Sequence, residues 1–228
     1  MDILNRFKIL EKPRLYSHGF SPAIWRIFGK IGNKFFQSYP PKKVDSSQKN
    51  LLNLGSGGIS LDAFINADFF RLHKIWSKDR ADWMLDITKP MKCHDNYWDG
   101  VIIEHTNEHI LYSDNYNMLS ELLRTMKPGG VLRIVVPDLD KYLDWENLKN
   151  TVPKMNRYQS LPEAICNLTQ NHLHVSVWNF DLMNEVLNDV GFTNITKTSF
   201  MKGVMPELLV DSENHQWQSL YIEAKKPI

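Results

Sequence analysis

The chain has 228 residues, of which 43% are apolar, and its formal net charge is +1. A chain of this size and composition can bury one substantial core, so we expect a single soluble domain with appendages. The two cysteines, Cys93 and Cys166, give neither a disulfide framework nor a metal-binding spacing, and no run approaches the roughly 20 apolar residues that span a bilayer. We therefore expect a cytoplasmic protein.

The first 50 residues are a basic arm. They carry ten Lys and Arg against three acids, a balance of +7, so the remaining 178 residues sum to −6. Ser21 and Pro22 suit the cap and first turn of a helix that would extend to about Gln37. We expect residues 1–48 to form this arm and its linker, and residues 49–228 to form the domain.

The expected helix at residues 21–37 has two interpretations. Its apolar residues could pack on the domain or cover a ligand there, and the proline-rich linker at residues 40–43 would let it fold back. Alternatively, its basic residues could attract it to an anionic membrane surface, which would place the protein at the inner face of the membrane. We favour packing on the domain. Nucleic-acid binding is not expected, because the acidic body would repel a phosphate backbone.

A glycine-rich turn follows the first predicted strand, in the stretch Leu51 to Gly58, which reads LLNLGSGG. Glycines at 55, 57 and 58 permit positive φ and let a ligand lie against the backbone. A dinucleotide fingerprint needs a third small residue three positions on, and pairs it with a pyrophosphate at a helix N-terminus. Ser60 stands at that position here. The turn therefore predicts a nucleotide-like ligand without deciding which one.

Charge decides between the nucleotide ligands. Residues 51–70 contain no Lys or Arg, whereas Asp62 and Asp68 are acidic, so the region suits a cofactor without phosphate. S-adenosylmethionine fits this description. Asp68, at the end of the second strand, would accept from the ribose hydroxyls, and Asp86, after the third, from the adenine amine.

The remaining elements are predicted in the order that an open α/β sheet requires. Residues 98–103 form a near-continuous apolar run typical of a strand buried on both faces. A helix is predicted from Asp114 to Met126, a turn at residues 127–130, and a fifth strand over residues 131–136. A later helix would begin with Asp181 as its cap and end at Gly191. Residues 193–200 and 217–224 have strand character.

Taken together, these motifs resemble class I S-adenosylmethionine-dependent methyltransferases of the methyltransferase-11 type, nearest to the short bacterial and phage-borne members. The resemblance rests on five motifs in register across residues 51–139, with weaker matches at His174 and at residues 181–192. The five motifs are LNLGSG from Leu52, NAD ending at Asp68, DITKP from Asp86, Glu108-His109, and MKPGGVLRIVVPDL ending at Leu139.

The resemblance implies a three-layer Rossmann-like α/β fold, with a seven-stranded, mostly parallel sheet, helices on both faces and an antiparallel last strand. It also implies a set of cofactor-binding positions: Asn53, Gly55, Ser56, Gly57, Asp68, Asp86, Ile87 and Glu104. Asn53 stands where many members carry a carboxylate. Only ten residues separate Gly57 from Asp68, so the usual first helix should be shortened or absent.

The candidate catalytic groups follow the fourth strand, where residues 104–109 read EHTNEH. An acceptor hydroxyl would benefit from a general base, and we name His105 first and His174 second for that role. A purely structural role for His105 stays open. His105 and His109 have the spacing of metal ligands, but a third ligand is not placed, so we expect no bound metal. The resemblance implies a structural, pocket-lining role for Glu108 and His109.

Substrate recognition is expected in an insertion around residues 138–178. It contains several aromatic and histidine residues, which would suit a sugar-binding cleft and would equally suit a small core. These residues are Tyr142, Trp145, Tyr158, His172, His174 and Trp178.

Three functions remain open from sequence. We favour methyl transfer to a hydroxyl of a small molecule or glycan, because similar short members are often found with surface-polysaccharide synthesis. The alternatives are a non-catalytic protein of the same fold that binds a partner or a membrane, and a nicotinamide-dependent oxidoreductase. The missing third glycine and the absence of basic residues count against the last.

Overall fold

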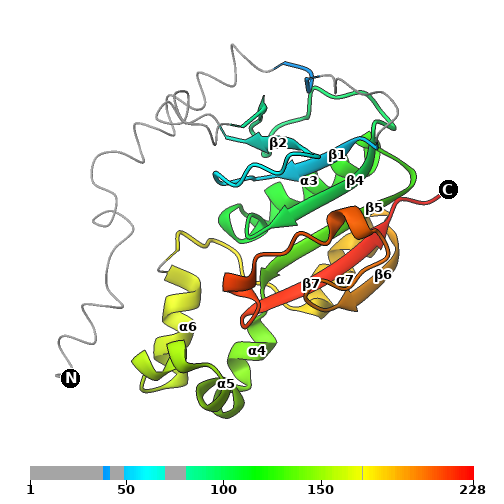
Figure 1. Cartoon of the computed structure of the whole chain (residues 1–228). Coiled ribbons are helices and arrows are strands. Elements are labelled where there is room, and N and C mark those ends of the chain that lie inside the picture. The colour runs from blue at the N-terminus through cyan, green and yellow to red at the C-terminus, as the bar shows by residue number, and fades with distance from the viewer. Residues whose placement is uncertain (1–37, 42–48, 70–80, 171) are drawn as a thin grey trace.

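The computed structural model describes residues 38–41, 49–69, 81–170 and 172–228, so the helix expected at residues 21–37 lies outside the described residues. The described residues form one seven-stranded sheet in the order β3-β2-β1-β4-β5-β7-β6 (Figure 1). The strands are β1 (Leu51–Leu54), β2 (Ile65–Asp68), β3 (Trp83–Met84), β4 (Trp98–Glu104), β5 (Met126–Pro137), β6 (Thr193–Thr198) and β7 (Ser219–Lys225).

The strand directions confirm the expected sheet. The strands β3, β2, β1, β4 and β5 pair in parallel, whereas β7 pairs antiparallel with both β5 and β6. The parallel strands therefore present their carboxyl ends at one edge, where open α/β sheets bind ligands. The predicted α/β fold class is confirmed.

One face of the sheet is covered by two helices, α3 (Tyr112–Thr125) and α7 (Phe180–Val190), which also contact each other. Met118, Leu119 and Leu122 recur at helical spacing on α3 and are fully buried with Met183 and Leu187 of α7. They pack against apolar residues of the strands to form the main core. The two helices thus cover this face of the sheet, and α3 begins shortly after the loop that follows β4.

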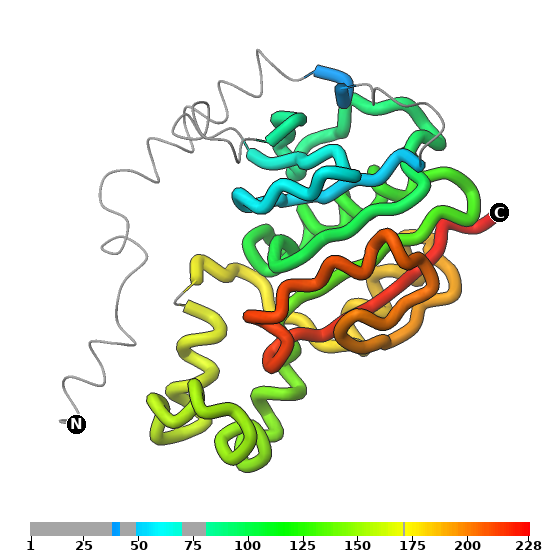
Figure 2. The backbone as a smooth tube through the Cα atoms, viewed as in Figure 1, coloured from blue at the N-terminus to red at the C-terminus, as the bar shows by residue number. Residues whose placement is uncertain are grey.

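The connection between β6 and β7 lies on the opposite face, where Figure 2 shows it running across the sheet. It contains two short 3-10 helices, η4 (Pro206–Leu208) and η5 (Glu213–His215). Met205 and Leu208 of this connection pack with Leu51, Ile102 and Val131 in a second apolar cluster. Among the described residues, this connection takes the place that helices were expected to occupy on this face.

A buried arginine fastens this connection to the sheet. Arg133 of β5 has no exposed surface and makes a two-pronged pair with Asp211, at 2.7 and 2.6 Å. It also donates to Glu223 of β7 at 3.1 Å and to the carbonyl oxygens of Lys202 and Ser199. The buried guanidinium of Arg133 and the two buried carboxylates thus neutralise one another inside the protein.

Three α-helices and a 3-10 helix follow β5 and lie at one end of the sheet (Figure 1). They are α4 (Leu139–Leu143), α5 (Trp145–Thr151), η3 (Pro153–Arg157) and α6 (Leu161–Gln170). Tyr142 and Tyr158 are 1% and 4% exposed and share a small core with Leu148, Met155 and Leu168. The aromatic residues of the insertion were expected to line a sugar-binding cleft or to form a small core. Both tyrosines belong to a small core.

Several predicted boundaries need correction. The helix predicted from Asp114 begins at Tyr112, and the turn predicted at residues 127–130 belongs to β5, because Met126 already pairs with Trp98. The cap of α7 is Asn179 and not Asp181, because the Asn179 side chain accepts from the backbone N–H of Leu182.

Two other expectations hold. Gly191 ends α7 with a φ of +110°. No helix lies between β1 and β2, as the short spacing predicted. Within the described part of the chain, none of the helices has the length and apolarity that crossing a membrane requires.

Candidate functional site

The predicted cofactor residues lie along the carboxyl edge of four adjacent strands. Leu54 is level with Ala67, and Asn53 with Ile102, so Gly55 follows on beside Asp68 and Glu104. Asp68 is in turn level with Met84, two residues before Asp86. Since neighbouring strands are about 4.8 Å apart, the glycine turn and these carboxylates border one short stretch of the edge.

The glycine turn has the conformation that its sequence predicts. Gly55, Gly57 and Gly58 have φ values of +78°, +61° and +132°. A Cβ at Gly55 would overlap the side chain of Thr106, which lies directly against it, whereas a Cβ at Gly57 would meet only a carbonyl oxygen at 3.9 Å. Gly55 thus permits close packing against Thr106, whereas a Cβ at Gly57 would find room among the described residues.

Asn53 is used inside the protein. It is buried, and its Nδ2 donates to the carbonyl oxygen of Ile59 at 3.2 Å and to Oδ1 of Asn66 at 3.0 Å. Asn66 in turn donates to Asp82 and accepts from the backbone of Leu61. The side chain of Asn53 therefore shapes the β1–β2 connection, and its contact with a cofactor stays a prediction.

The two aspartates differ in their surroundings. Asp68 is half-buried at the end of β2, and its Oδ1 accepts from the N–H of Phe69. Asp86 is buried, and its Oδ1 accepts from the backbone and hydroxyl of Thr88, at 3.1 and 2.7 Å. Ile87 packs against the main core. The bonds to Thr88 fix the orientation of the Asp86 carboxylate.

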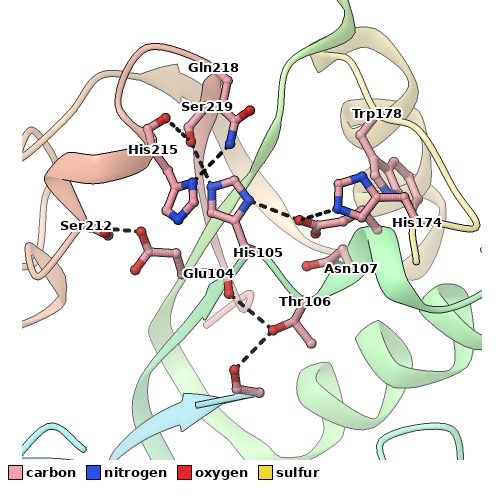
Figure 3. A network of polar contacts seen from close by, with 12 residues as sticks. Glu104, His105, Thr106, Asn107, His174, Trp178, Ser212, His215, Gln218 and Ser219 are labelled. Atoms are coloured by element: carbon pink, nitrogen blue, oxygen red, sulfur yellow. Dashed lines mark hydrogen bonds and ion pairs between the residues drawn. The ribbon is translucent and has the colours of Figure 1, made fainter. Parts of the chain in front are cut away.

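Glu104 turns toward the β6–β7 connection, where its Oε1 accepts from the N–H of Ser212 at 2.8 Å (Figure 3). Burial raises the pKa of this carboxyl, and the hydrogen bond from Ser212 only partly offsets the effect. This contact does not involve a cofactor, so the role of Glu104 in binding one stays a prediction. The contact does link the end of β4 to the connection over the sheet.

Beyond Glu104, five histidines gather around one buried carboxylate, that of Glu108, which is 1% exposed. His105 Nδ1 lies 3.0 Å from Glu108 Oε1, and His174 Nε2 lies 3.8 Å from the same oxygen. The two rings therefore approach the same carboxylate oxygen. The ring centroids of His109 and His172 lie 4.9 and 5.6 Å from that of His174. The ring centroids of His215 and His105 are 4.4 Å apart.

Both nitrogens of His105 are engaged. Nε2 lies 2.9 Å from Ser219 Oγ, and that hydroxyl donates its only hydrogen to the carbonyl oxygen of His215 at 2.7 Å. Ser219 therefore accepts from His105, and Nδ1 faces the Glu108 carboxylate. His105 itself has a φ of +49°, a left-handed conformation uncommon outside glycine. The loop thus holds His105 in one orientation.

The cluster has unusual acid–base properties. Burial alone would raise the pKa of Glu108, but the hydrogen bond from His105 and the positive charges of His105, His109 and His174 lower it overall. Burial lowers the pKa of His174 to about 4, and the charge of Glu108 opposes this only in part. Burial also lowers the pKa values of His172 and His215. His174, the buried imidazole next to the Glu108 carboxylate, is therefore largely neutral at neutral pH.

The segment at residues 174–178 is joined to the loop after β4. The backbone N–H groups of Val175 and Ser176 donate to the carbonyl oxygen of Glu108, at 2.7 and 3.2 Å. Ser176 Oγ donates to the carbonyl oxygen of Asn107, and Trp178 Nε1 donates to Ser176 Oγ. Trp178 is 1% exposed, so it supports the cluster from the core.

The sequence singled out His105 and His174, and the structure brings both to Glu108. His215 and Ser219 were not predicted from the sequence, because they lie about 110 residues farther along the chain and belong to no recognisable motif. The sequence also did not join Glu108, His109 and His174, which each offer a metal-ligating atom, all within 4.8 Å of one another.

No family model matches the sequence, and no curated protein matches it. Solved structures do match. An S-adenosylmethionine-dependent methyltransferase from Thermotoga maritima is similar over 89% of this chain and 99% of its own, with 15% identity and a TM-score of 0.50. A second from Archaeoglobus fulgidus is similar over 99% of this chain and 100% of its own, with 17% identity and a TM-score of 0.48. At these identities the likeness is one of fold: the chain has the fold of S-adenosylmethionine-dependent methyltransferases.

Proposed function

We propose that the protein transfers a methyl group from S-adenosylmethionine to a hydroxyl oxygen of a small-molecule or glycan acceptor. The observation that carries this proposal is the order of groups along the carboxyl edge of the sheet. The glycine turn after β1, the acids after β2 and β3, and the Glu108 cluster after β4 follow one another across adjacent strands. The shared fold supports the same reading.

The cofactor would lie across the turn and the two aspartates. The positive φ values of the glycines would let it lie close to the turn, Asp68 would accept from the ribose hydroxyls, and Asp86, held by Thr88, from the adenine amine. The bound cofactor would supply an electrophilic methyl group. Most of the acceleration would come from holding the acceptor oxygen in line with that group, because methyl transfer needs alignment above all.

Two histidines are candidates to receive the proton of the hydroxyl. His105 could receive it at Nε2 only after giving up its contact with Ser219 and carrying its hydrogen on Nδ1, toward Glu108. His174 has its Nδ1–H directed to the carbonyl oxygen of Leu168, at 2.6 Å, which leaves Nε2 as its accepting nitrogen. Either would act beside Glu108, whose negative charge would stabilise the imidazolium that forms.

One observation favours a second function. The Asn53 side-chain amide donates to Ile59 and Asn66. Many members of the methyltransferase family that the sequence resembles carry a carboxylate at this position. A non-catalytic protein that binds a partner, or a membrane through residues 21–37, would not need that group. The intact glycine turn and the two aspartates weigh against this alternative.

The experiment is a transfer assay with methyl-labelled S-adenosylmethionine. The acceptors are two matched panels, sugars and small molecules that carry hydroxyls, and analogues that carry amines instead. We expect label in the hydroxyl panel only. Label confined to the amine panel would refute the oxygen acceptor, and tight cofactor binding without transfer to either panel would favour the non-catalytic alternative.

The proton acceptor is tested with His105→Ala and His174→Ala in the same assay. Loss of a general base lowers the transfer rate by about 10²–10⁴-fold. The variant that loses rate while keeping its affinity for the cofactor identifies the base. Equal losses of rate and affinity would mean that the histidine only shapes the site.

A further inference from the structure

We propose that Glu108, His109 and His174 bind a divalent transition-metal ion and leave part of its coordination sphere open. One ligand atom of each residue lies within 4.8 Å of the other two. Two imidazoles and one carboxylate are a donor set suited to Zn²⁺, Co²⁺ and Fe²⁺. This set differs from the pair His105 and His109, whose lack of a third ligand led us to expect no metal from the sequence.

The carboxylate of Glu108 supplies the first argument. Its side chain is 2% exposed, and its Oε2 has no hydrogen-bond partner among the described residues, although Oε1 accepts from His105. An ionised carboxylate in the interior is costly unless its oxygens are compensated. A metal ion that the carboxylate holds through both oxygens would compensate Oε2 and still lie next to Oε1, which His105 orients.

The orientation of His174 supplies the second argument. Its Nδ1 lies 2.6 Å from the carbonyl oxygen of Leu168, which can only accept, so Nδ1 carries the hydrogen. Nε2 therefore presents a lone pair, and it lies 3.8 Å from Glu108 Oε1. Metal-ligating histidines commonly donate their other N–H to a backbone carbonyl in this way.

The separations suit one ion. Ligand atoms about 2.0–2.2 Å from a zinc ion lie about 3–4 Å from one another around it. The distance between His174 Nε2 and Glu108 Oε1 falls in that range, and the third atom needs only a small closure. Two N ligands distinguish this site from the all-oxygen sites that Mg²⁺ and Ca²⁺ prefer.

The third ligand faces outward. His109 is exposed, and its ring meets that of His174 edge to face at 4.9 Å, whereas the other two ligands are buried. Three protein ligands leave a fourth position of a tetrahedral ion for water or another oxygen. If the proposed function holds, that position would take the acceptor oxygen, lower its pKa and orient it; His174 would then serve as a ligand, and His105 would remain the candidate base.

The test uses the full chain without a histidine tag, treated with a chelator and then dialysed. Co²⁺ binding is followed by visible absorption, and Zn²⁺ binding by competition with a chromophoric chelator. His109→Ala and His174→Ala remove ligands, and the exposed position of His109 means that its variant should fold. His94→Ala is the matched control, because His94 stacks on Tyr39 away from the cluster.

We expect one ion per chain for the unchanged protein and for His94→Ala, and an affinity lower by at least about tenfold for His109→Ala and His174→Ala. The proposal is overturned if the unchanged protein binds neither ion, or if both ligand variants bind as His94→Ala does. A parallel titration with S-adenosylmethionine separates the two proposals. Cofactor binding without metal binding defeats only the metal site, and the reverse defeats only the proposed function.

Discussion

Glu108 is the centre of the polar cluster beyond β4. Some of the residues around it could be predicted from the sequence, and others could not. His105 and His174 were identified from their chemistry and their places after predicted elements, and both contact Glu108. Ser219 and His215 could not be identified, because only the pairing of β7 with β5 brings them to the end of β4. Local motifs reveal groups that follow strands, whereas contacts between distant segments need the fold.

Gly55 carries the first prediction. In Gly55→Ala, the new methyl group would overlap Thr106 and the residue would keep a positive φ, so we expect destabilisation of more than about 1–2 kcal/mol, the cost of the left-handed conformation alone. The measurement is urea unfolding. Gly129→Ala is the control, since Gly129 has a φ of +76° and no described atom lies within 4 Å of its added Cβ. Equal losses in the two variants would show that packing against Thr106 is unimportant.

Asp86 carries the second prediction. Asp86→Ala should weaken binding of S-adenosylmethionine by about 1–3 kcal/mol, because the adenine amine would lose its acceptor. The measurement is calorimetric titration of the folded variant. Asp86 also accepts from Thr88, so Thr88→Val is the control for the shape of the turn. Unchanged affinity in Asp86→Ala would refute the role of the carboxylate, and equal losses in both variants would assign the effect to the turn.

At the scale of elements, hydrophobic periodicity predicted α3 and α7 and the strands β4 and β5, but it did not predict α4, α5 and α6 in the insertion. The apolar stripe of α3 and the left-handed Gly191 after α7 are local features, and both are confirmed. The extension of β5 back to Met126 was missed, because it depends on pairing with Trp98 of β4. Asn179 was missed as a cap because Asp181, two residues on, is an equally good cap by type.

Arg133 carries the element-scale prediction. Arg133→Met would leave Asp211 and Glu223 buried without their partner, so we expect a loss of about 3–5 kcal/mol in the free energy of unfolding. Lys127→Met on the same strand is the control. Its pair with Asp99 is 2.7 Å long but the lysine is 41% exposed, so its loss should cost at most about 1 kcal/mol. Similar urea midpoints for the two variants would contradict the anchoring role of Arg133.

At the scale of the whole molecule, the fold class and the antiparallel last strand followed from the resemblance of the sequence to a family, and the role of the insertion did not. Aromatic residues after β5 suited a sugar site or a core equally, because type and spacing do not reveal exposure. The structure buries Tyr142, Tyr158 and Trp178. Their rings are therefore not available for stacking on a sugar, and the proposal of a hydroxyl acceptor rests on the histidine cluster instead.

The last variants concern the N-terminal arm. Trp83 Nε1 donates to the carbonyl oxygen of Ser38 at 2.9 Å, and Tyr39 stacks on His94 at 4.7 Å, so residues 38–41 pack beside β3. Deleting residues 1–43 should thus cost about 1 kcal/mol or more of stability, whereas deleting residues 1–37 spares these contacts. Thermal unfolding compares the two. Equal stability of both truncated chains would contradict the packing, and loss of vesicle binding in both would assign a membrane contact to residues 1–37.

The central claim is that the edge of β1, β2 and β3 binds S-adenosylmethionine. The most direct measurement is a calorimetric titration of the unchanged protein with S-adenosylmethionine and S-adenosylhomocysteine, with NAD as the control. We predict binding of the first two at micromolar concentrations and none of NAD, whose pyrophosphate meets no basic residue in positions 51–70. Binding of NAD, or of none of the three, would contradict the account.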